Sequence, residues 1–347
     1  MNQFRRLLFP FSLIYGMVTA IRNLLFDVGV FQSYSPPTPT IVVGNLSTGG
    51  TGKSPHVLYL YNMLHTRYKT AILSRGYGRK TKGFSYVTHN HTAADVGDEP
   101  LQFLSHIGQH ALVAVCEKRV LGIQTILTDH PDVELILLDD AFQHRALKGG
   151  FQILLSDFND PFFKDLVLPA GNLREFSIGK HRADCCVFTK CPEIITEATR
   201  QTYRQQFDTS KPVYFSRIAY GTFTPLNAIH QMEDITHIVL VTGIANPHVL
   251  IDHCRKTYEV TPIIFKDHHN FSVKDIHQIH EIFGNFTTEK YAIVTTDKDA
   301  MRLNSNEFKK ITADYPWFTL PISIEIEDNI KFENEIINYV EHHKRSS

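Results

Sequence analysis

The residues with the clearest chemistry lie in a glycine-rich loop that joins a short β-branched run to a helical pattern. The stretch from residue 40 to 54 reads TIVVGNLSTGGTGKS, and apolar residues follow it at helical spacing through residue 64. A strand, a glycine loop and a helix in this order form the setting of a phosphate-binding loop, because amides at the helix start point toward anionic oxygens. The sequence therefore predicts a nucleotide site formed by Ser47, Thr48, Gly49, Gly50, Thr51, Gly52, Lys53 and Ser54.

Two side chains at the end of this loop have defined tasks in phosphoryl chemistry. Lys53 is expected to reach the β- and γ-phosphates of a nucleotide, and the Ser54 hydroxyl is expected to hold Mg²⁺. The usual pattern starts with a glycine five residues before Gly52, where this chain has Ser47. A simple glycine-rich turn is the alternative, and the Gly-Lys-Ser ending favours a nucleotide site over it.

Two acidic motifs downstream supply the carboxylates that a nucleotide enzyme needs. The apolar run that closes at Leu138 is followed by Asp139 and Asp140, the position at which enzymes with a phosphate loop hold Mg²⁺ or its water. Asp98, in the turn GDEP, is by default an acid that caps a helix. If the other acids hold the metal, Asp98 remains to accept the proton of an acceptor hydroxyl, as a kinase requires.

Further polar residues follow other predicted strands. His268 or His269, in the turn DHH, would orient or assist Asp98 from a second domain; a metal pair with Asp267 and a surface turn are the alternatives. The carboxyl ends of parallel strands carry the working loops of a sheet, so three loops are expected at the site. They are the basic loop with Arg75, Tyr77 and Arg79 (or a solvated turn), the segment 141–145, and the turn-rich loop 168–175 with Arg174 and Glu175.

The N-terminal segment 4–31 is apolar but short for a membrane span. An uncharged stretch runs from Leu7 to Ile21 between arginines, which is less than the roughly 20 residues that a spanning helix needs. Arginines beside apolar and aromatic residues are typical of a helix that lies in the headgroup layer of a membrane. A buried or partner-binding helix and a cleaved signal peptide are the alternatives, the latter without a convincing cleavage site.

Composition narrows the class of protein. A length of 347 residues corresponds to about two domains, and an apolar fraction of 43% supports a sizeable core. A net charge of −1 provides no basic field for binding nucleic acid. The five cysteines fit neither a zinc-finger spacing nor a disulfide framework, so we expect buried free thiols and a reducing compartment, the cytoplasm.

Strands alternate with helices along most of the chain, which predicts an α/β fold. Residues 1–205 are expected to form a nucleotide-binding core of the P-loop NTPase type, with a mostly parallel sheet, helices on both faces and the N-terminal interfacial helix. Residues 206–347 are expected to form a smaller α/β domain that closes the cleft.

Taken together, the motifs resemble those of the tetraacyldisaccharide 4′-kinase family, the lipid A disaccharide kinases. In order they are VGNLSTGGTGKSP, LSRGYGRK, GDEP, LLDDAFQHR, LPAGNLRE, VTGIANP, FKDHHNF and VTTDKDA, and the resemblance runs from about residue 4 to residue 303. It implies a P-loop core, a smaller second domain and an N-terminal helix that contacts the membrane. It also implies transfer of the ATP γ-phosphate, with Mg²⁺, to the 4′-hydroxyl of a tetraacylated lipid A disaccharide 1-phosphate precursor in lipopolysaccharide biosynthesis.

The same resemblance implies a location and a set of site residues. The enzyme would be peripheral at the cytoplasmic face of the inner membrane, with no nucleic acid and no obligate protein partner. Ala141 and Asn172 stand where glycine and proline are expected, which affects only the shape of the loops. The residues that match by motif are the phosphate-loop Lys53 and Ser54, the catalytic carboxylate Asp98 with its partner His268, the magnesium-site acids Asp139 and Asp140, and the site-lining Gln143, His144, Arg174 and Glu175.

Two other functions are compatible with the motifs. One is a P-loop ATPase, ligase or GTPase that acts on a soluble acceptor; the tetrapeptide DKDA at 297–300 is not the guanine-reading Asn-Lys-x-Asp, which counts against a GTPase. The other is a non-catalytic protein that binds nucleotide and docks a partner through the N-terminal helix.

Overall fold

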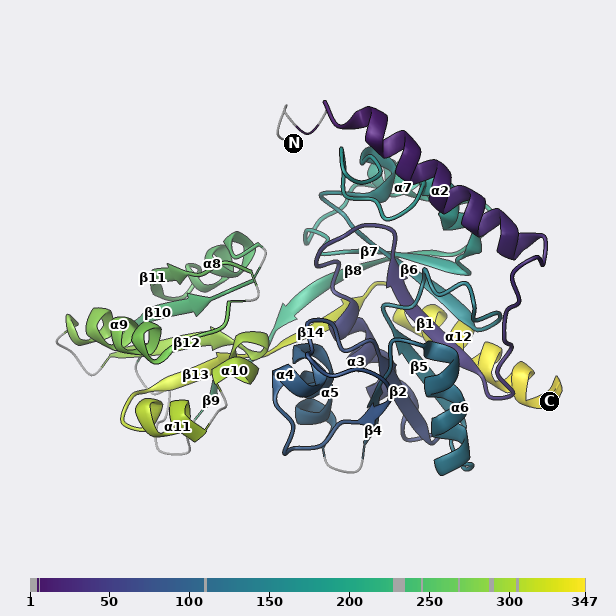
Figure 1. Ribbon diagram of the computed structural model, residues 1–347. Coiled ribbons are helices and arrows are strands. Elements are labelled where there is room, and N and C mark those ends of the chain that lie inside the picture. The colour runs from purple at the N-terminus through teal and green to yellow at the C-terminus, as the bar shows by residue number, and fades with distance from the viewer. Residues whose placement is uncertain are drawn as a thin grey trace. The chain divides into compact units, whose positions relative to one another are not determined.

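The computed structural model describes residues 5, 7–108, 111–226, 235–244, 246–267, 269–286, 290–303 and 306–346. Contacts between residues divide the chain into two compact units, one made of Met1–Ile218 with Ile324–Ser347 and the other of Ala219–Ser323. Strands and helices alternate in both units (Figure 1). The predicted α/β fold class is therefore confirmed.

The first unit is built on a nine-stranded sheet in the order β14-β8-β7-β6-β1-β5-β2-β4-β3. The strands from β8 to β4 pair in parallel, and β3 closes the edge in the antiparallel sense. In chain order the strands are β1 (Thr40–Asn45), β2 (Thr70–Ser74), β3 (Ser85–Tyr86), β4 (Leu112–Val115), β5 (Leu135–Asp139), β6 (Phe151–Asp157), β7 (Cys185–Thr189), β8 (Val213–Tyr220) and β14 (Ile322–Ile326).

Helices cover both faces of this sheet, which explains why its central strands carry apolar residues on both faces, as Ile41, Val42 and Val43 do in β1. Ile41 and Val43 of β1 pack in the core formed with α3, α5 and α12, whereas Val42 packs in the core formed with α6. The helical elements of the unit are α2 (Phe9–Asp27), α3 (Lys53–Leu64), α4 (Ala93–Val96), α5 (Asp98–Ile107), α6 (Arg119–Asp129), the 3₁₀ turns η1 (Phe162–Lys164) and η2 (Ser177–Arg182), α7 (Glu197–Phe207) and α12 (Asn329–Ser346).

The C-terminal helix α12 belongs to the first unit, which differs from the predicted division at residues 206–347. Phe332, Ile336 and Val340 are fully buried in the same core as the helix after the phosphate loop. Figure 1 shows this helix, in yellow, among the purple and blue elements of the first unit. The chain therefore leaves the first unit through β8 and returns to it through β14.

The second unit holds a five-stranded sheet in the order β11-β10-β12-β13-β9, parallel except for β9. Its elements are β9 (Thr224–Pro225), β10 (His237–Thr242), α8 (His248–Cys254), β11 (Glu259–Ile264), α9 (Val273–Gly284), β12 (Tyr291–Thr296), α10 (Asp297–Leu303), α11 (Asn306–Thr312) and β13 (Trp317–Leu320). His268 lies outside the described residues. Its neighbour His269 is described, and its Nε2 lies 3.0 Å from Oδ2 of Asp275. That this unit closes a cleft remains a prediction.

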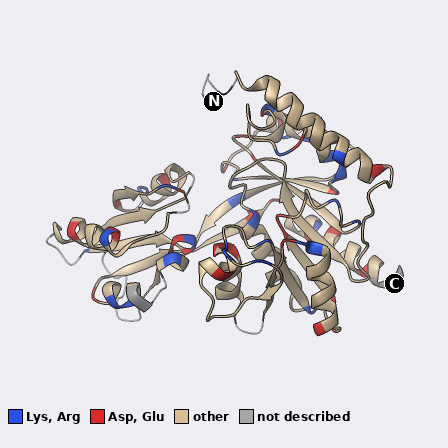
Figure 2. Ribbon diagram, viewed as in Figure 1, with Lys and Arg blue, Asp and Glu red and all other residues tan. Residues whose placement is uncertain are grey.

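The N-terminal helix α2 has an exposed apolar face. It is long and apolar enough, by length and composition, to cross a membrane. Figure 2 shows it almost free of charged residues along its length. Large apolar side chains are exposed on this helix and its flanks: Leu7, Phe11, Ile14, Met17, Val18, Ile21, Leu24, Val28 and Val30.

Candidate active site at the phosphate-binding loop

Three neighbouring parallel strands bring the predicted site residues together. Val43 of β1 is in register with Asp139 at the end of β5, and Leu73 of β2 is in register with Leu138. The residues that follow these strands therefore emerge at one edge of the sheet, where working loops of parallel sheets lie. This arrangement brings the phosphate loop, the acidic pair and the loop after β2 to one place.

Hydrogen bonds from the end of β1 and from the loop 168–175 hold the phosphate loop in place. The Asn45 side-chain amide, at the end of β1, donates to the Thr51 hydroxyl over 2.9 Å, and Thr48 N donates to the carbonyl of Asn172 over 2.7 Å. Ser47 forms an isolated antiparallel bridge with Leu173. Ser47 is not among the residues with positive φ, so the first glycine of the usual pattern is not needed for the backbone here.

Lys53 faces a compact ion cluster. Its Nζ lies 3.8 Å from Oδ1 of Asp140, and only 9% of its side chain is exposed. Arg174 donates to both carboxylate oxygens of Asp140, over 2.8 and 3.2 Å. The two cations hold the pKa of Asp140 below its usual value against the opposing effect of burial, the largest single influence on that carboxyl. Asp140 is thus ionised, and it already forms ion pairs with Lys53 and Arg174.

Asp139 has a different environment, because it is completely buried. Its Oδ2 accepts a hydrogen bond from the Ser74 hydroxyl over 2.8 Å, and its main-chain oxygen accepts from Arg119 over 3.0 Å. Its Oδ1 is buried with no hydrogen-bond partner. Burial, then the nearby charges of Glu99 and Asp140, raises the pKa of Asp139 to about 7. An unpartnered carboxylate oxygen under negative potential fits a cation or its water.

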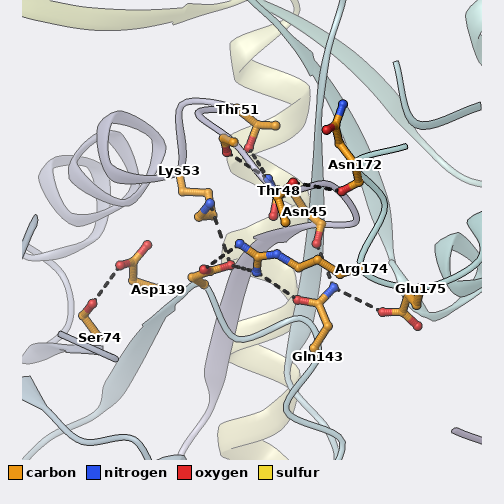
Figure 3. A network of polar contacts seen from close by, with 12 residues as sticks. Asn45, Thr48, Thr51, Lys53, Ser74, Asp139, Gln143, Asn172, Arg174 and Glu175 are labelled. Carbon is orange, nitrogen blue, oxygen red and sulfur yellow. Dashed lines mark hydrogen bonds and ion pairs between the residues drawn. The ribbon is translucent and has the colours of Figure 1, made fainter. Parts of the chain in front are cut away.

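A chain of hydrogen bonds extends from this cluster to the N-terminal helix. Gln143 accepts from Arg174 and donates to Glu175 over 3.1 Å and to the main-chain oxygen of Asn45 over 2.8 Å (Figure 3). Glu175 in turn accepts from Asn23 of α2 over 2.7 Å. Gln143, Arg174 and Glu175, which are predicted to line the site, thus form one network.

Other contacts fasten α2 and Arg5, which precedes it, to the loop around residue 171. Arg5 donates to the carbonyl of Gly171 and Ala170 N donates to the Ser12 hydroxyl. Gly16 lies against the ring of Phe176, since an added Cβ would stand 2.3 Å from the nearest ring carbon. One side of α2 is therefore part of the site's framework while its other side is exposed.

Asp98 lies at the start of α5, partly buried, next to the loop that follows β2. Gly97 precedes it with φ of 93°, and a Cβ there would stand 2.9 Å from the carbonyl oxygen of Tyr77. The two turns therefore pack backbone to backbone, which only glycine allows. Tyr77 is 70% exposed, and Arg75 is also exposed. Burial and the positive charges of Arg119 and Arg75 lower the pKa of His144 to about 4.

Arg79 makes its hydrogen bonds within and beside the loop that follows β2. Its guanidinium pairs with Glu117 at 2.6 Å and donates to the carbonyl of Gly83, and its side chain is only 2% exposed. Its Nε and Nη1 are buried with no hydrogen-bond partner. That Arg79 lines the site stays a prediction.

Several residues of this site were not predicted. One is Glu99, whose charge acts on Asp139. Its position beside Asp98 in the GDEP turn was the available signal. The others are support residues that no local pattern marks: Asn23, Asn45, Ser74, Arg119 and Arg182.

The raised pKa of Asp139 leads to a testable stability effect. Because the folded pKa of about 7 exceeds the unfolded value of 3.8, ionising Asp139 opposes folding as pH rises through that interval. Asp139→Asn removes this cost, so without nucleotide or metal the variant should melt roughly 3–10 °C above wild type at neutral pH and much closer to it near pH 4. Thermal melts at a series of pH values measure this. A difference that is the same at all pH values would contradict the assignment.

Comparison with known proteins identifies the family to which this geometry belongs. A family model described as tetraacyldisaccharide-1-P 4′-kinase (LpxK) matches residues 4–341. The tetraacyldisaccharide 4′-kinase of Bacteroides thetaiotaomicron is 42% identical over 98% of this chain and 94% of its own length, and that of Flavobacterium psychrophilum is 41% identical over 98% of both. Among solved structures, LpxK from Aquifex aeolicus, crystallised in complex with ATP, has a TM-score of 0.76 and 28% identity, covering 97% of this chain and all of the other. With the phosphate loop, the acidic pair and the GDEP turn gathered at one sheet edge, these matches show that the chain belongs to the tetraacyldisaccharide-1-P 4′-kinase family.

Proposed function

We propose that this protein transfers the γ-phosphoryl group of ATP to the 4′-hydroxyl of a tetraacylated lipid A disaccharide 1-phosphate. The family membership over residues 4–341 supports the acceptor, and the ATP complex of the Aquifex aeolicus relative supports the donor. The observation that carries the proposal is the cationic cluster of Lys53 and Arg174 around Asp140 beside the phosphate loop. Phosphoryl transfer depends mainly on such positioning and charge stabilisation.

Each part of the site has a role in this reaction. The loop amides and Lys53 bind the phosphates of ATP. The acceptor oxygen attacks the γ-phosphorus, the bond from that phosphorus to the β–γ bridging oxygen breaks, and ADP leaves. Asp98 accepts the acceptor's proton as the new P–O bond forms. The partnership of Asp98 with His268 stays a prediction.

The residues present fit a magnesium ion, but Asp139 and Asp140 are not equally available as its ligands. Asp139, with its unpartnered Oδ1, and Ser54 would hold the ion, whereas both oxygens of Asp140 are engaged by Arg174. Magnesium is usually bound by one or two carboxylates together with substrate phosphates. When bound, Mg²⁺ neutralises negative charge on the transferring phosphoryl group.

We also propose that α2 rests on the cytoplasmic face of the inner membrane. Its exposed apolar side chains suit the boundary between headgroups and acyl chains. Its other side contacts the site framework through Asn23 and Arg22. The helix would thus place the acyl chains of the acceptor in lipid while its sugar reaches the site.

Substitutions on the exposed face of α2 test this placement better than a deletion, which would also remove Arg22 and Asn23 from the site. Val18→Glu is expected to weaken binding to liposomes of mixed anionic composition by about tenfold or more, because a 62% exposed apolar side chain can no longer enter the lipid. Flotation without any other protein measures the effect. Ile194→Glu, at an equally apolar exposed position of the same unit, serves as the matched control and should float like wild type. Equal flotation of wild type and both variants would refute the membrane role.

An assay with two acceptors tests the proposed reaction. Purified protein is given radiolabelled ATP with either the lipid disaccharide 1-phosphate in mixed micelles or a soluble sugar alcohol. Label is expected in the lipid only. Label in the soluble acceptor would favour the alternative enzyme, and nucleotide binding with no transfer to either would favour a non-catalytic protein.

A further inference from the structure

A buried histidine lies directly behind the phosphate loop. His56 is in the first turns of α3, and its Nδ1 lies 2.7 Å from the carbonyl oxygen of Gly52. Its Nε2 lies 3.0 Å from the hydroxyl of Ser216 in β8. Both side chains are almost completely buried. No step of the proposed reaction uses either residue.

The chemistry of the two partners determines the direction of both hydrogen bonds. A carbonyl oxygen can only accept, so Nδ1 must carry the proton. The ring is almost completely buried and its nitrogens contact a carbonyl and a hydroxyl, neither of which is an anion that would favour a charged imidazolium, so the ring is neutral. Nε2 is therefore the acceptor, and the Ser216 hydroxyl donates to it. The hydroxyl thereby selects the tautomer that donates to Gly52.

The orientation of the Gly52 carbonyl also determines that of a group that would face a nucleotide bound in the loop. It belongs to the same peptide unit as the amide N–H of Lys53, and a trans peptide is planar with its C=O and N–H on opposite sides. Holding the oxygen toward His56 therefore directs the Lys53 N–H the other way, out of the start of α3, where helix N-termini bind anions. Gly52 has φ of 82° and no side chain with which to cap the helix. The main-chain N–H of His56 also donates to this oxygen over 3.2 Å, a longer contact than that of the ring.

We propose that His56 is a positioning residue for phosphoryl transfer, which clamps the Gly52–Lys53 peptide through Nδ1 and is itself held by Ser216. The proposal rests on the proposed function, since it concerns the loop that binds ATP. A ring held at both nitrogens restrains the peptide better than a flexible side chain, and small displacements of a pre-organised site cost rate as well as affinity.

Two isosteric substitutions separate this role from simple core packing. The amide nitrogen of asparagine occupies the place of Nδ1, and that of glutamine the place of Nε2. His56→Asn keeps the donor to Gly52 and should retain the wild-type KM for ATP within about threefold. His56→Gln loses that donor and should raise the KM for ATP and lower kcat, each by about tenfold or more, since a buried carbonyl then loses a hydrogen bond.

Binding and stability are measured beside the kinetics, on the full chain. Titration with a fluorescent ATP analogue should show the same order, with His56→Gln binding more weakly than His56→Asn. Melting temperatures should fall by similar amounts in both variants, because both remove a packed ring. Equal KM and analogue affinity in the two variants would overturn the clamp. Failure of the wild-type protein to bind the analogue would instead refute the proposed function.

A second pair of variants applies if His56→Gln does not fold. Ser216→Ala removes only the hydroxyl that holds the ring, and it is expected to raise the KM for ATP by about two- to fivefold. Ser216→Thr keeps a hydroxyl and should restore the wild-type value. An unchanged KM in Ser216→Ala would overturn the proposal.

Discussion

Asp98→Asn is expected to lower kcat for phosphoryl transfer to the lipid acceptor by about 10²- to 10⁴-fold, the usual contribution of a positioned general base. Asparagine is nearly isosteric with aspartate but cannot accept a proton from the attacking hydroxyl. The side chain stands at the start of α5, beside the loop that follows β2 and next to Glu99, which acts on Asp139 through its charge. Initial rates at saturating ATP and lipid measure the effect.

Nucleotide binding separates this role from damage to the site. The affinity for an ATP analogue should stay within about threefold of wild type in Asp98→Asn, because the residue is assigned to the acceptor side of the reaction. Asp95→Asn is the matched control: its carboxylate, three residues earlier, caps the short helix α4 through Thr92. The control should keep wild-type kcat. A wild-type rate in Asp98→Asn would remove Asp98 from the mechanism.

Lys53→Met is expected to lower kcat/KM for ATP by about 10²-fold or more, because a cation aimed at developing phosphoryl charge is lost from a shielded site. Methionine keeps most of the apolar stem of this 9% exposed side chain. Asp140 keeps its two-pronged pairing with Arg174, so the variant should fold. Steady-state kinetics with varied ATP, beside a thermal melt, measure both effects.

A lysine on the surface of the same unit provides the comparison. Lys69 pairs with Asp132 where both side chains are half-exposed or more, and such pairs contribute little to stability. Lys69→Met should leave the kinetics and the melting temperature near wild type. If Lys53→Met retained the kinetics of Lys69→Met, the loop would not be a phosphate site.

The sequence was sufficient for the elements whose signals are local. The β-branched run before the glycine loop and the apolar run before Asp139 predicted two central strands, because strands buried on both faces are near-continuous apolar runs. The order strand, loop, helix placed Lys53 and Ser54 at the start of a helix, where the structure has them. The α/β class followed from the same alternation.

Roles that depend on distant partners could not be predicted in this way. Arg75 and Arg79 look equivalent in a basic loop. Glu117, which follows β4, pairs with Arg79, whose side chain is buried, whereas Arg75 is exposed. Asp139 and Asp140 are adjacent, and what distinguishes them is Ser74 on one side and Arg174 on the other. Each of these partners lies more than thirty residues away in the chain, beyond the reach of any local pattern.

The place of the C-terminal helix α12 in the first unit could not be predicted for the same reason. Phe332, Ile336 and Val340 form an apolar stripe that either unit could bury, and sequence order placed them with residues 206–347. The stripe packs instead in the core beneath the phosphate-loop helix, where Tyr59 also donates to Glu333 over 2.8 Å. Only three-dimensional complementarity between the stripe and that core decides between the two units.

The position of the new phosphate on the lipid tests the central claim most directly. The product formed from ATP and tetraacyldisaccharide 1-phosphate is purified, and phosphorus–proton correlation NMR identifies the carbon that carries the second phosphate. We expect one added phosphomonoester, on the 4′-oxygen, with one ADP released for each lipid modified. Phosphate at another oxygen, or ADP release without a phosphorylated lipid, would contradict it.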